Sequence, residues 1–204
     1  MEKEEKLDEL EEIDHFPFIE GKIVDLCARN SKHLEVYTRW KNDPIVRQYA
    51  RNVMPRSLDE QKKSSERTQG RMPEFISFEI WHKKDKKPLG IIGLGWINWV
   101  NGWANAFIHI GEKEYWNKNV ATEATEMLVE YAFNELNLNK LHGGVAVKNV
   151  GSWSVAEKIG FELEGIGKEE MYVNGEYLNN KTFRLLKEDW QKRKEKENKF
   201  DREG

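Results

Sequence analysis

The sequence Y-W-N-K-N-V-A-T-E-A, residues 115–124, marks the point where a turn passes into a helix. Apolar side chains recur from there at intervals of three and four residues, at Val120, Ala121, Ala124, Met127, Leu128, Tyr131, Ala132 and Leu136. This spacing is the period of an amphipathic helix. We therefore expect a helix over residues 120–136 with one buried face.

The residues before this helix predict what its first turn can bind. Residues 106–110 read as a short buried strand, which Gly111 and the polar run 112–118 bring to an end. A strand that turns directly into a helix leaves several backbone N–H groups without partners. With the positive end of the helix dipole beside them, such groups bind phosphate oxygens.

The residues after the helix complete a recognisable core. G-G-V-A-V-K-N-V-G-S at residues 143–152 predicts a second strand, and V-A-E-K-I-G-F at residues 155–161 a short helix. The whole stretch resembles the acetyl-CoA binding core of the GNAT acetyltransferases, and most closely the RimJ/RimL-like branch, which acetylates protein N-termini and amines. The resemblance extends over residues 21–190. It implies an α/β fold with a mixed, mostly antiparallel sheet, helices on both faces, and two middle strands that splay apart.

In this family the turn before the helix holds the pyrophosphate of the cofactor. The positions that the resemblance assigns to it are Trp116, Asn117, Lys118, Asn119, Val120, Ala121 and Thr122. Asn119 stands where a glycine is common, and Asn117 also departs from the branch pattern. Asn is the non-glycine residue that adopts a left-handed backbone most readily, so the turn can keep its shape. The alternative is an ordinary polar helix start, in a non-catalytic GNAT-fold module that binds CoA or acts as an interaction partner.

The resemblance also assigns residues to the pantetheine arm and to the reaction. Ile108 and Ile110 would pair with the arm like a neighbouring strand, and Asn149 would hold it by its side-chain amide. The implied reaction is direct attack of a primary amine on the thioester of acetyl-CoA, the co-substrate. Many members protonate the leaving thiolate with a tyrosine, which is Ala156 here. In the branch motif N-x-x-S, Ser152 takes that place, with a helix N-cap as its structural alternative.

The sequence does not single out one general base for the amine. The position of an acid that some members use aligns with Met171, and the adjacent Glu170 should face the other side of its strand. His109 is a candidate because imidazole exchanges protons near neutral pH, although a structural role is its alternative. Without either, a chain of water molecules would take the proton from the amine.

Composition limits the partners. The chain has 33 basic and 36 acidic residues and a formal charge of −3, which gives no electrostatic reason to bind nucleic acid or an anionic membrane. No apolar run has the length of a membrane span, the N-terminus is too acidic for a signal peptide, and the lone Cys27 excludes an internal disulfide. We expect a cytoplasmic protein. No spacing of histidines or cysteines predicts a metal site.

Further patterns complete the organisation. Residues 1–14 read as an acidic N-terminal extension, 15–190 as the GNAT domain and 191–204 as a charged C-terminal tail. A strand is expected over 21–29 and a helix over 31–40 with Ser31 as N-cap, which N-D-P at residues 42–44 ends. A second helix is expected over 57–70, capped by Ser57, and in the family this helical region and its loops form much of the acceptor wall. Strands over 75–82 and 89–96 should form a hairpin, with Gly90, Gly93 and Gly95 allowing close packing. The aromatic cluster of Trp96, Trp99 and Trp103 is read as core or lid, with a homodimer contact as an alternative.

Overall fold

The computed structural model describes residues 15–50, 53–64 and 72–203, and its centre is an eight-stranded sheet. The strand order is β1-β2-β3-β4-β5-β6-β8-β7. The strands are β1 (Pro17–Glu20), β2 (Val24–Ala28), β3 (Ile76–His82), β4 (Lys87–Asn98), β5 (Trp103–Ile110), β6 (Lys140–Ala146), β7 (Glu162–Val173) and β8 (Glu176–Leu186). Neighbours are antiparallel, except for β5 and β6, which run parallel. The expected mixed, mostly antiparallel sheet is confirmed.

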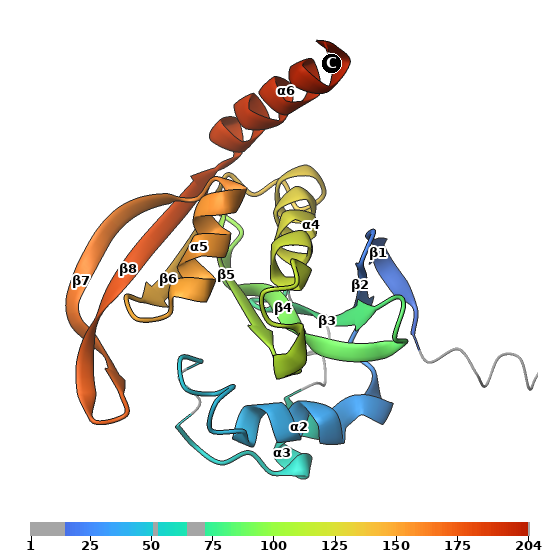
Figure 1. Cartoon of the computed structure of the whole chain (residues 1–204), viewed down its shortest axis with the longest axis vertical. Coiled ribbons are helices and arrows are strands. Elements are labelled where there is room, and N and C mark those ends of the chain that lie inside the picture. The colour runs from blue at the N-terminus through green and yellow to red at the C-terminus, as the bar shows by residue number, and fades with distance from the viewer. Residues whose placement is uncertain (1–14, 51–52, 65–71, 204) are drawn as a thin grey trace, which may run out of the picture.

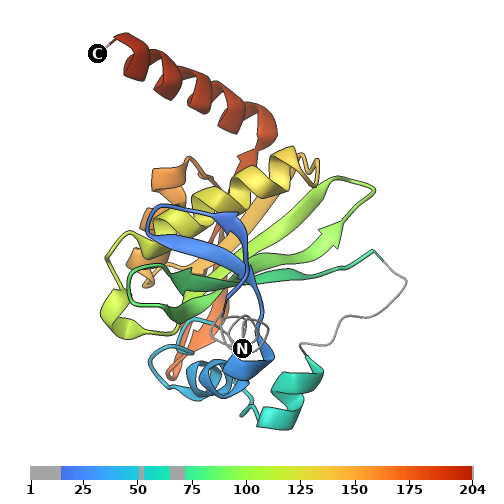
Figure 2. The same cartoon turned by 90° about the vertical axis from the view of Figure 1, so that its right-hand side faces the viewer.

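Helices cover both faces of this sheet, as Figures 1 and 2 show. They are α2 (Leu34–Asn42), α3 (Leu58–Lys63), α4 (Val120–Asn134), α5 (Val150–Ile159) and α6 (Lys187–Glu203), with short 3-10 turns η1 (Ser31–His33) and η2 (Lys113–Tyr115). On one face, α4 buries Val120, Ala124 and Leu128 in the main core with side chains of β4 such as Ile92 and Leu94. On the other face, α2 forms a smaller core. The buried stripe predicted for α4 is confirmed, and the helix ends two residues earlier than expected.

Helix α2 also fixes the segment that follows β5. Tyr37 and Trp40 of α2 pack against Ile91, and both rings are almost fully buried. The indole Nε1 of Trp40 donates to Glu112 Oε1 at 2.7 Å. One residue further on, Lys113 Nζ donates to Asp43 Oδ2, also at 2.7 Å. The turn between β5 and α4 is therefore anchored to the opposite side of the sheet.

The N-terminal elements differ from the predicted ones in two respects. Strand β1, which pairs with β2, was not predicted because its exposed residues alternate too weakly to stand out from the sequence. Ser31 is not the N-cap of the first helix. The cap is Asn30, whose side chain accepts from the Lys32 amide at 2.9 Å and begins the 3-10 turn η1 ahead of α2. The predicted end of the helix at the N-D-P sequence is confirmed.

The second predicted helix has the expected start. Ser57 and Glu60 form a capping box, in which the Glu60 amide donates to Ser57 Oγ at 3.2 Å and the Ser57 amide donates to Glu60 Oε2 at 2.9 Å. Helix α3 ends at Lys63. The remainder of the predicted helix falls largely on residues 65–71, which lie outside the described residues.

The glycines of β4 are packing residues, as predicted. A Cβ at Gly93 would lie 2.2 Å from the carbonyl oxygen of Ile76, and one at Gly90 would lie 2.3 Å from that of His109. Neighbouring backbones thus occupy the space that a side chain would need. In β2, Cys27 is buried, and burial raises the pKa of its thiol to about 12, so the thiol stays protonated as expected for a structural cysteine.

The three central tryptophans do not form one cluster. Trp96 is 62 % exposed and meets Phe75 edge-on, Trp99 packs against the core and donates from Nε1 to the Pro73 carbonyl at 2.9 Å, and Trp103 contacts His142. Their closeness in sequence reflects a turn between antiparallel strands, which directs neighbouring side chains to different surfaces. Only Trp99 belongs to the predicted core.

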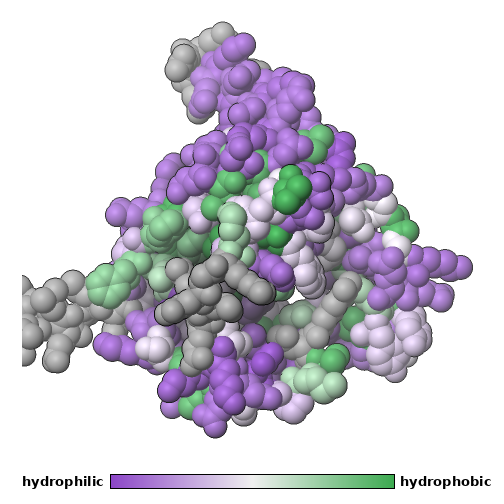
Figure 3. Space-filling model, turned by 180° about the vertical axis from the view of Figure 1, so that it is seen from behind, coloured by the Kyte–Doolittle hydropathy of each residue, from purple (hydrophilic) through white to green (hydrophobic). Residues whose placement is uncertain are grey.

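The chain ends in a long hairpin of β7 and β8 followed by helix α6. Strand β7 is one of the two edge strands of the sheet, and its pairing with β8 is irregular between Leu163 and Gly165 and between Gly167 and Met171. Helix α6 continues through residue 190 without a break and docks through Trp190, which contacts Phe133. Figure 3 shows hydrophilic side chains over the projecting part of this helix. Among the described residues, no helix combines the length and apolar composition needed to cross a bilayer.

The contact between Gly111 and Trp40 gives a test of this anchoring. A Cβ at Gly111 would lie 2.1 Å from the Trp40 ring, so we expect Gly111→Ala to lower the free energy of unfolding by about 1–3 kcal/mol through overpacking. Chemical denaturation measures this. Gly151→Ala is the control, because a Cβ there has no heavy atom within 4 Å and alanine favours the helix. Equal stability of the two variants would contradict the packing of α2 against the turn.

Candidate functional site

The candidate site is the gap between β5 and β6. The two strands pair only at Trp103, Ala104 and Asn105, opposite Lys140, Leu141 and His142. Beyond these residues the strands diverge, which Figure 1 shows as the space below α4 and α5. The predicted splay of the two middle strands is therefore confirmed.

The hydrogen-bond register shows which backbone groups of β5 face this gap. The Gly111 amide donates to the Leu89 carbonyl of β4 at 2.8 Å. Because antiparallel bonding alternates with a period of two, His109 also turns its amide and carbonyl toward β4, whereas Ile108 and Ile110 turn theirs toward the gap. The Ile110 carbonyl accepts from Trp116 Nε1 at 3.0 Å, which agrees with this direction. Ile108 is thus left as the freer of the two pairing positions that the sequence suggested.

The turn before α4 has the backbone shape that the two asparagines were expected to permit. Asn117 and Asn119 have φ angles of 60° and 61°, in the left-handed region, and Asn119 is the N-cap of α4. Within the described part of the chain, the amides of residues 117–122 make no hydrogen bond. They stand at the positive end of a 15-residue helix. This concentration of unpaired donors fits an anion, and a diphosphate in particular.

Two lysines add positive charge to this turn. Lys158 of α5 directs its Nζ to Asn119 Oδ1 at 3.4 Å, so the Asn119 side chain is directed toward α5. Lys118 Nζ lies 5.2 Å from the centre of the Tyr115 ring, at the turn itself. Both amines are exposed and can move toward a bound anion.

The start of α5 holds the second group of predicted residues. Asn149 is the N-cap of α5 by position, yet its side chain makes no capping bond, and Ser152 is the third residue of the helix. The alternative reading of Ser152 as an N-cap is therefore wrong, because the helix begins at Val150 rather than Trp153. Both side chains are partly buried and have no hydrogen-bond partner among the described residues. They lie just beyond the end of β6, on the far side of the gap from Ile108.

His109 belongs to the other face of the sheet. Its neighbours in β5, Ile108 and Ile110, pack against the core under α4, so alternation directs the His109 ring toward α2. Burial, followed by the positive charges of Lys41 and Arg29, lowers the pKa of His109 to about 4. The imidazole is therefore neutral at pH 7.

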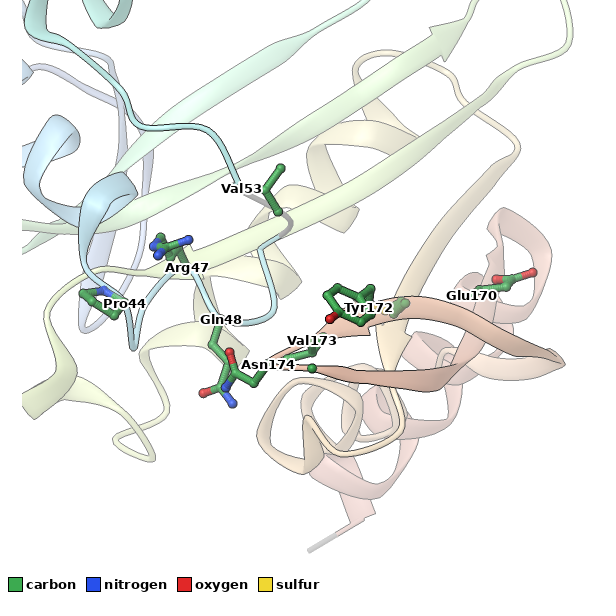
Figure 4. Close-up of a pocket in the computed structure, with 10 residues that line it drawn as sticks. Pro44, Arg47, Gln48, Val53, Glu170, Tyr172, Val173 and Asn174 are labelled. Carbon is green, nitrogen blue, oxygen red and sulfur yellow. The ribbon is translucent and has the colours of Figure 1, made fainter.

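A groove opens on the same side as His109. It has a volume of about 380 Å³ and lies between the segment after α2 and the β7–β8 hairpin. Figure 4 shows Pro44, Arg47 and Gln48 on one wall and Tyr172, Val173 and Asn174 on the other. The resemblance assigned the acceptor wall to the helical region 57–70 and its loops, and the described residues 57–64 of that region are not among those that line this groove. The contribution of Arg47 and Gln48 was missed, since the polar residues after N-D-P carry no motif.

The alignment of Met171 with a catalytic acid can be compared with its surroundings. Met171 is buried with Ala146, Val173 and Leu178, and it offers no proton-accepting group. Glu170 is exposed, so the two side chains face opposite ways as predicted. The carboxylate of Glu170 still borders the groove, where Oε2 accepts from Asn180 Nδ2 at 3.1 Å. Within the described residues, no group of three or more His, Cys, Asp or Glu side chains is placed to hold a metal ion.

The sequence of this chain is similar to those of several proteins described as N-acetyltransferases. The chain is 34% identical over 118 residues to the probable N-acetyltransferase YjcK of Bacillus subtilis, a match that covers 57% of this chain and 64% of the relative. It is 38% identical over 102 residues to the putative ribosomal N-acetyltransferase YdaF of the same organism, covering 50% and 55%. The spermidine N(1)-acetyltransferase of Escherichia coli is 36% identical over 95 residues, covering 47% and 50%. The chain thus matches about half to two thirds of the length of these relatives.

Solved structures agree in fold. A spermidine N-acetyltransferase from Vibrio cholerae, crystallised with CoA and spermine, superposes with a TM-score of 0.74 at 24% identity, over 84% of this chain and 99% of that one. An acetyltransferase of the GNAT family from Bacillus anthracis superposes with a TM-score of 0.71 at 19% identity, over 83% and 98%. The model of the acetyltransferase (GNAT) domain matches residues 26–162, which include the splayed strands and the turn before α4. The chain therefore belongs to the GNAT acetyltransferase family.

Proposed function

We propose that this chain transfers an acetyl group from acetyl-CoA to a primary amine, by direct attack within a ternary complex. The observation that carries the proposal is the anion cradle at residues 117–122 placed beside a gap with unpaired strand backbone. One feature suits a diphosphate and the other an extended amide-containing arm, and acetyl-CoA contains both. Family membership supports the same donor.

We propose the following roles for the residues in binding and catalysis. The amides of residues 117–122, with Lys118 and Lys158, hold the diphosphate, while the backbone of Ile108 and the Asn149 side chain orient the arm. The acceptor enters from the groove on the α2 side. Its nitrogen attacks the thioester carbon, the C–S bond breaks, and the leaving sulfur takes a proton from Ser152 directly or through water.

The proton lost by the amine goes to solvent through water. His109 lies on the acceptor side, but a group with a pKa of about 4 holds a proton poorly at neutral pH. A neutral His109 instead avoids placing a further positive charge where the amine must lose its own. We also place the reaction in the cytoplasm, where acetyl-CoA is available.

The proposal is tested by titrating the protein with acetyl-CoA and measuring free thiol with a panel of amines and N-terminal peptides. The expected result is binding of acetyl-CoA and of free CoA, with thiol release that depends on both the amine and the protein. Binding without thiol release for any amine would instead identify a non-catalytic CoA-binding module. If neither acetyl-CoA nor CoA binds at millimolar concentration, residues 117–122 do not form a diphosphate site.

Ala121→Glu tests the cradle directly. A carboxylate in the first turn of α4 would repel the diphosphate and fill its space, so we expect CoA affinity to fall at least about a hundredfold. Isothermal titration measures the loss. Asn134→Glu adds the same charge at the other end of α4, where it should leave affinity unchanged. Retained affinity in Ala121→Glu would mean that the diphosphate binds elsewhere.

Ser152→Ala tests the proton donor. We expect kcat to fall about ten- to a hundredfold while the KM for acetyl-CoA changes by less than about twofold, because the hydroxyl acts on the leaving sulfur. Ser154→Ala, on the exposed face of the same helix, is the matched control. An unchanged kcat would remove Ser152 from the chemistry.

The lowered pKa of His109 predicts a pH dependence of stability. The folded state takes up this proton near pH 4, whereas the unfolded state takes it up near 6.5. Stability from this group is thus complete above pH 6.5 and is lost as the pH falls toward 4, by roughly 2 kcal/mol at pH 5. Denaturation of His109→Asn should show a flatter dependence between pH 6.5 and 4 than the parent protein. An identical slope would mean that the pKa of His109 is not lowered in the folded protein.

A further inference from the structure

Strand β7 carries a bulge where it passes the groove. Its pairing with β8 breaks over residues 167–171, where three residues of β7 stand opposite the single residue Asn179. Within the bulge, Glu169 has a φ angle of 54°, in the left-handed region that residues with side chains avoid. The Glu169 amide donates to Asn179 Oδ1 at 3.0 Å, which holds this backbone in place. Bulges beside active sites redirect side chains, and the residue that follows here is Glu170.

The carboxylate of Glu170 lies over the backbone of Gly167. A Cβ at Gly167 would lie 2.0 Å from Glu170 Cδ and 2.2 Å from its Oε1, so a side chain at this position would displace the carboxylate. Asn180 Nδ2 donates to Glu170 Oε2 at 3.1 Å. The missing side chain at Gly167 and the amide of Asn180 together determine where the carboxylate lies.

Asn180 holds this carboxylate while part of its own side chain stays unsatisfied. The residue is 6 % exposed, and its Oδ1 is buried without a hydrogen-bond partner in the described part of the chain. A buried acceptor without a partner is unfavourable, and native proteins retain few of them. Together with the left-handed Glu169, two unfavourable features converge on the position of one carboxylate. Such features concentrate at functional sites.

The Glu170 carboxylate lies between the groove and the gap. Glu170 lines the groove, and Figure 4 shows it at the opposite end from Pro44. Asn180 pairs with Ala146, the last residue of β6, which borders the gap. Neighbouring strands are about 4.8 Å apart, so β7 and its carboxylate lie two strand spacings, about 10 Å, from β6. An acceptor that moves from the groove into the gap therefore passes Glu170.

This carboxylate can accept further hydrogen bonds. Glu170 is exposed, and the bond from Asn180 uses only one of the positions at which the two carboxylate oxygens accept. The described lining of the groove contains one carboxylate, that of Glu170, and one guanidinium, that of Arg47. Figure 4 shows Arg47 on the other wall, far along the groove from Glu170. The end of the groove at Glu170 therefore favours a cation.

Resting on the proposed function, we propose that Glu170 binds the acceptor, through charge-assisted hydrogen bonds from the ammonium form of the amine to its carboxylate. Asn180 is a positioning residue, because it acts on the acceptor only by holding Glu170. Since Glu170 is exposed, the ammonium bound there remains in contact with water, which takes its proton before the nitrogen enters the gap.

Glu170→Gln and Gly167→Ala test the charge and the position of this group separately. Glutamine keeps an oxygen that accepts from Asn180 but removes the charge, whereas a Cβ at residue 167 displaces the carboxylate and keeps its charge. Thiol release is measured with the full chain, and the concentrations of acetyl-CoA and of the most active amine of the panel are varied in turn. We expect each variant to raise the KM for the amine about tenfold and to change the KM for acetyl-CoA by less than about twofold.

Gly165→Ala is the matched control, because it adds the same methyl group to the same strand at a place where a Cβ has no heavy atom within 4 Å. Its two KM values should equal those of the parent chain. If either test variant leaves the KM for the amine unchanged, or raises both KM values equally, this inference alone is overturned. No thiol release by the parent chain with any amine overturns the proposed function and this inference with it.

Discussion

The structure depends on the short pairing between β5 and β6. Three residue pairs join strands β1 to β5 to strands β6, β8 and β7, and β5 and β6 then separate. Unpaired strand backbone is costly when it is buried without water or another partner. The separation is sustained because other contacts hold each half: α2 clamps the segment after β5 through Trp40 and Glu112, while β8 pairs along the whole of β6. Each edge of the gap is therefore supported by contacts that lie outside the gap.

The same arrangement explains how the turn before α4 accommodates two asparagines with left-handed backbones. The clamp and the register of β5 determine where the turn begins, and the helix determines where it ends. Between these fixed points Asn117 and Asn119 take left-handed conformations, which cost asparagine less than other side-chain-bearing residues. The Asn119 side chain is at the same time directed toward Lys158. The amides of the turn are thus left without hydrogen bonds within the described part of the chain.

The sequence predicted those features that depend on interactions between residues close together in the chain. The period of α4, the capping box at Ser57 and the left-handed asparagines are such features. The divergence of the two middle strands was expected from the resemblance to the GNAT family. The sequence did not predict β1, whose pairing is its main support, or the 3-10 start of α2. The groove and the charge around His109 were also missed. These features bring together residues from β2, the segment after α2, β5 and the β7–β8 hairpin. A pattern within one segment cannot predict contacts between segments that lie far apart in the sequence.

The irregular edge strand β7 has a consequence for the behaviour of the protein at high concentration. An exposed strand edge of 12 residues with Leu163 and Ile166 on its surface is a template onto which another chain could add. Its two breaks in register, the left-handed Glu169 and the charges of Glu162, Glu164 and Lys168 interrupt any straight run of matching donors and acceptors. Edge-to-edge aggregation is thereby disfavoured, and the long hairpin that forms one wall of the groove can remain exposed in a crowded solution.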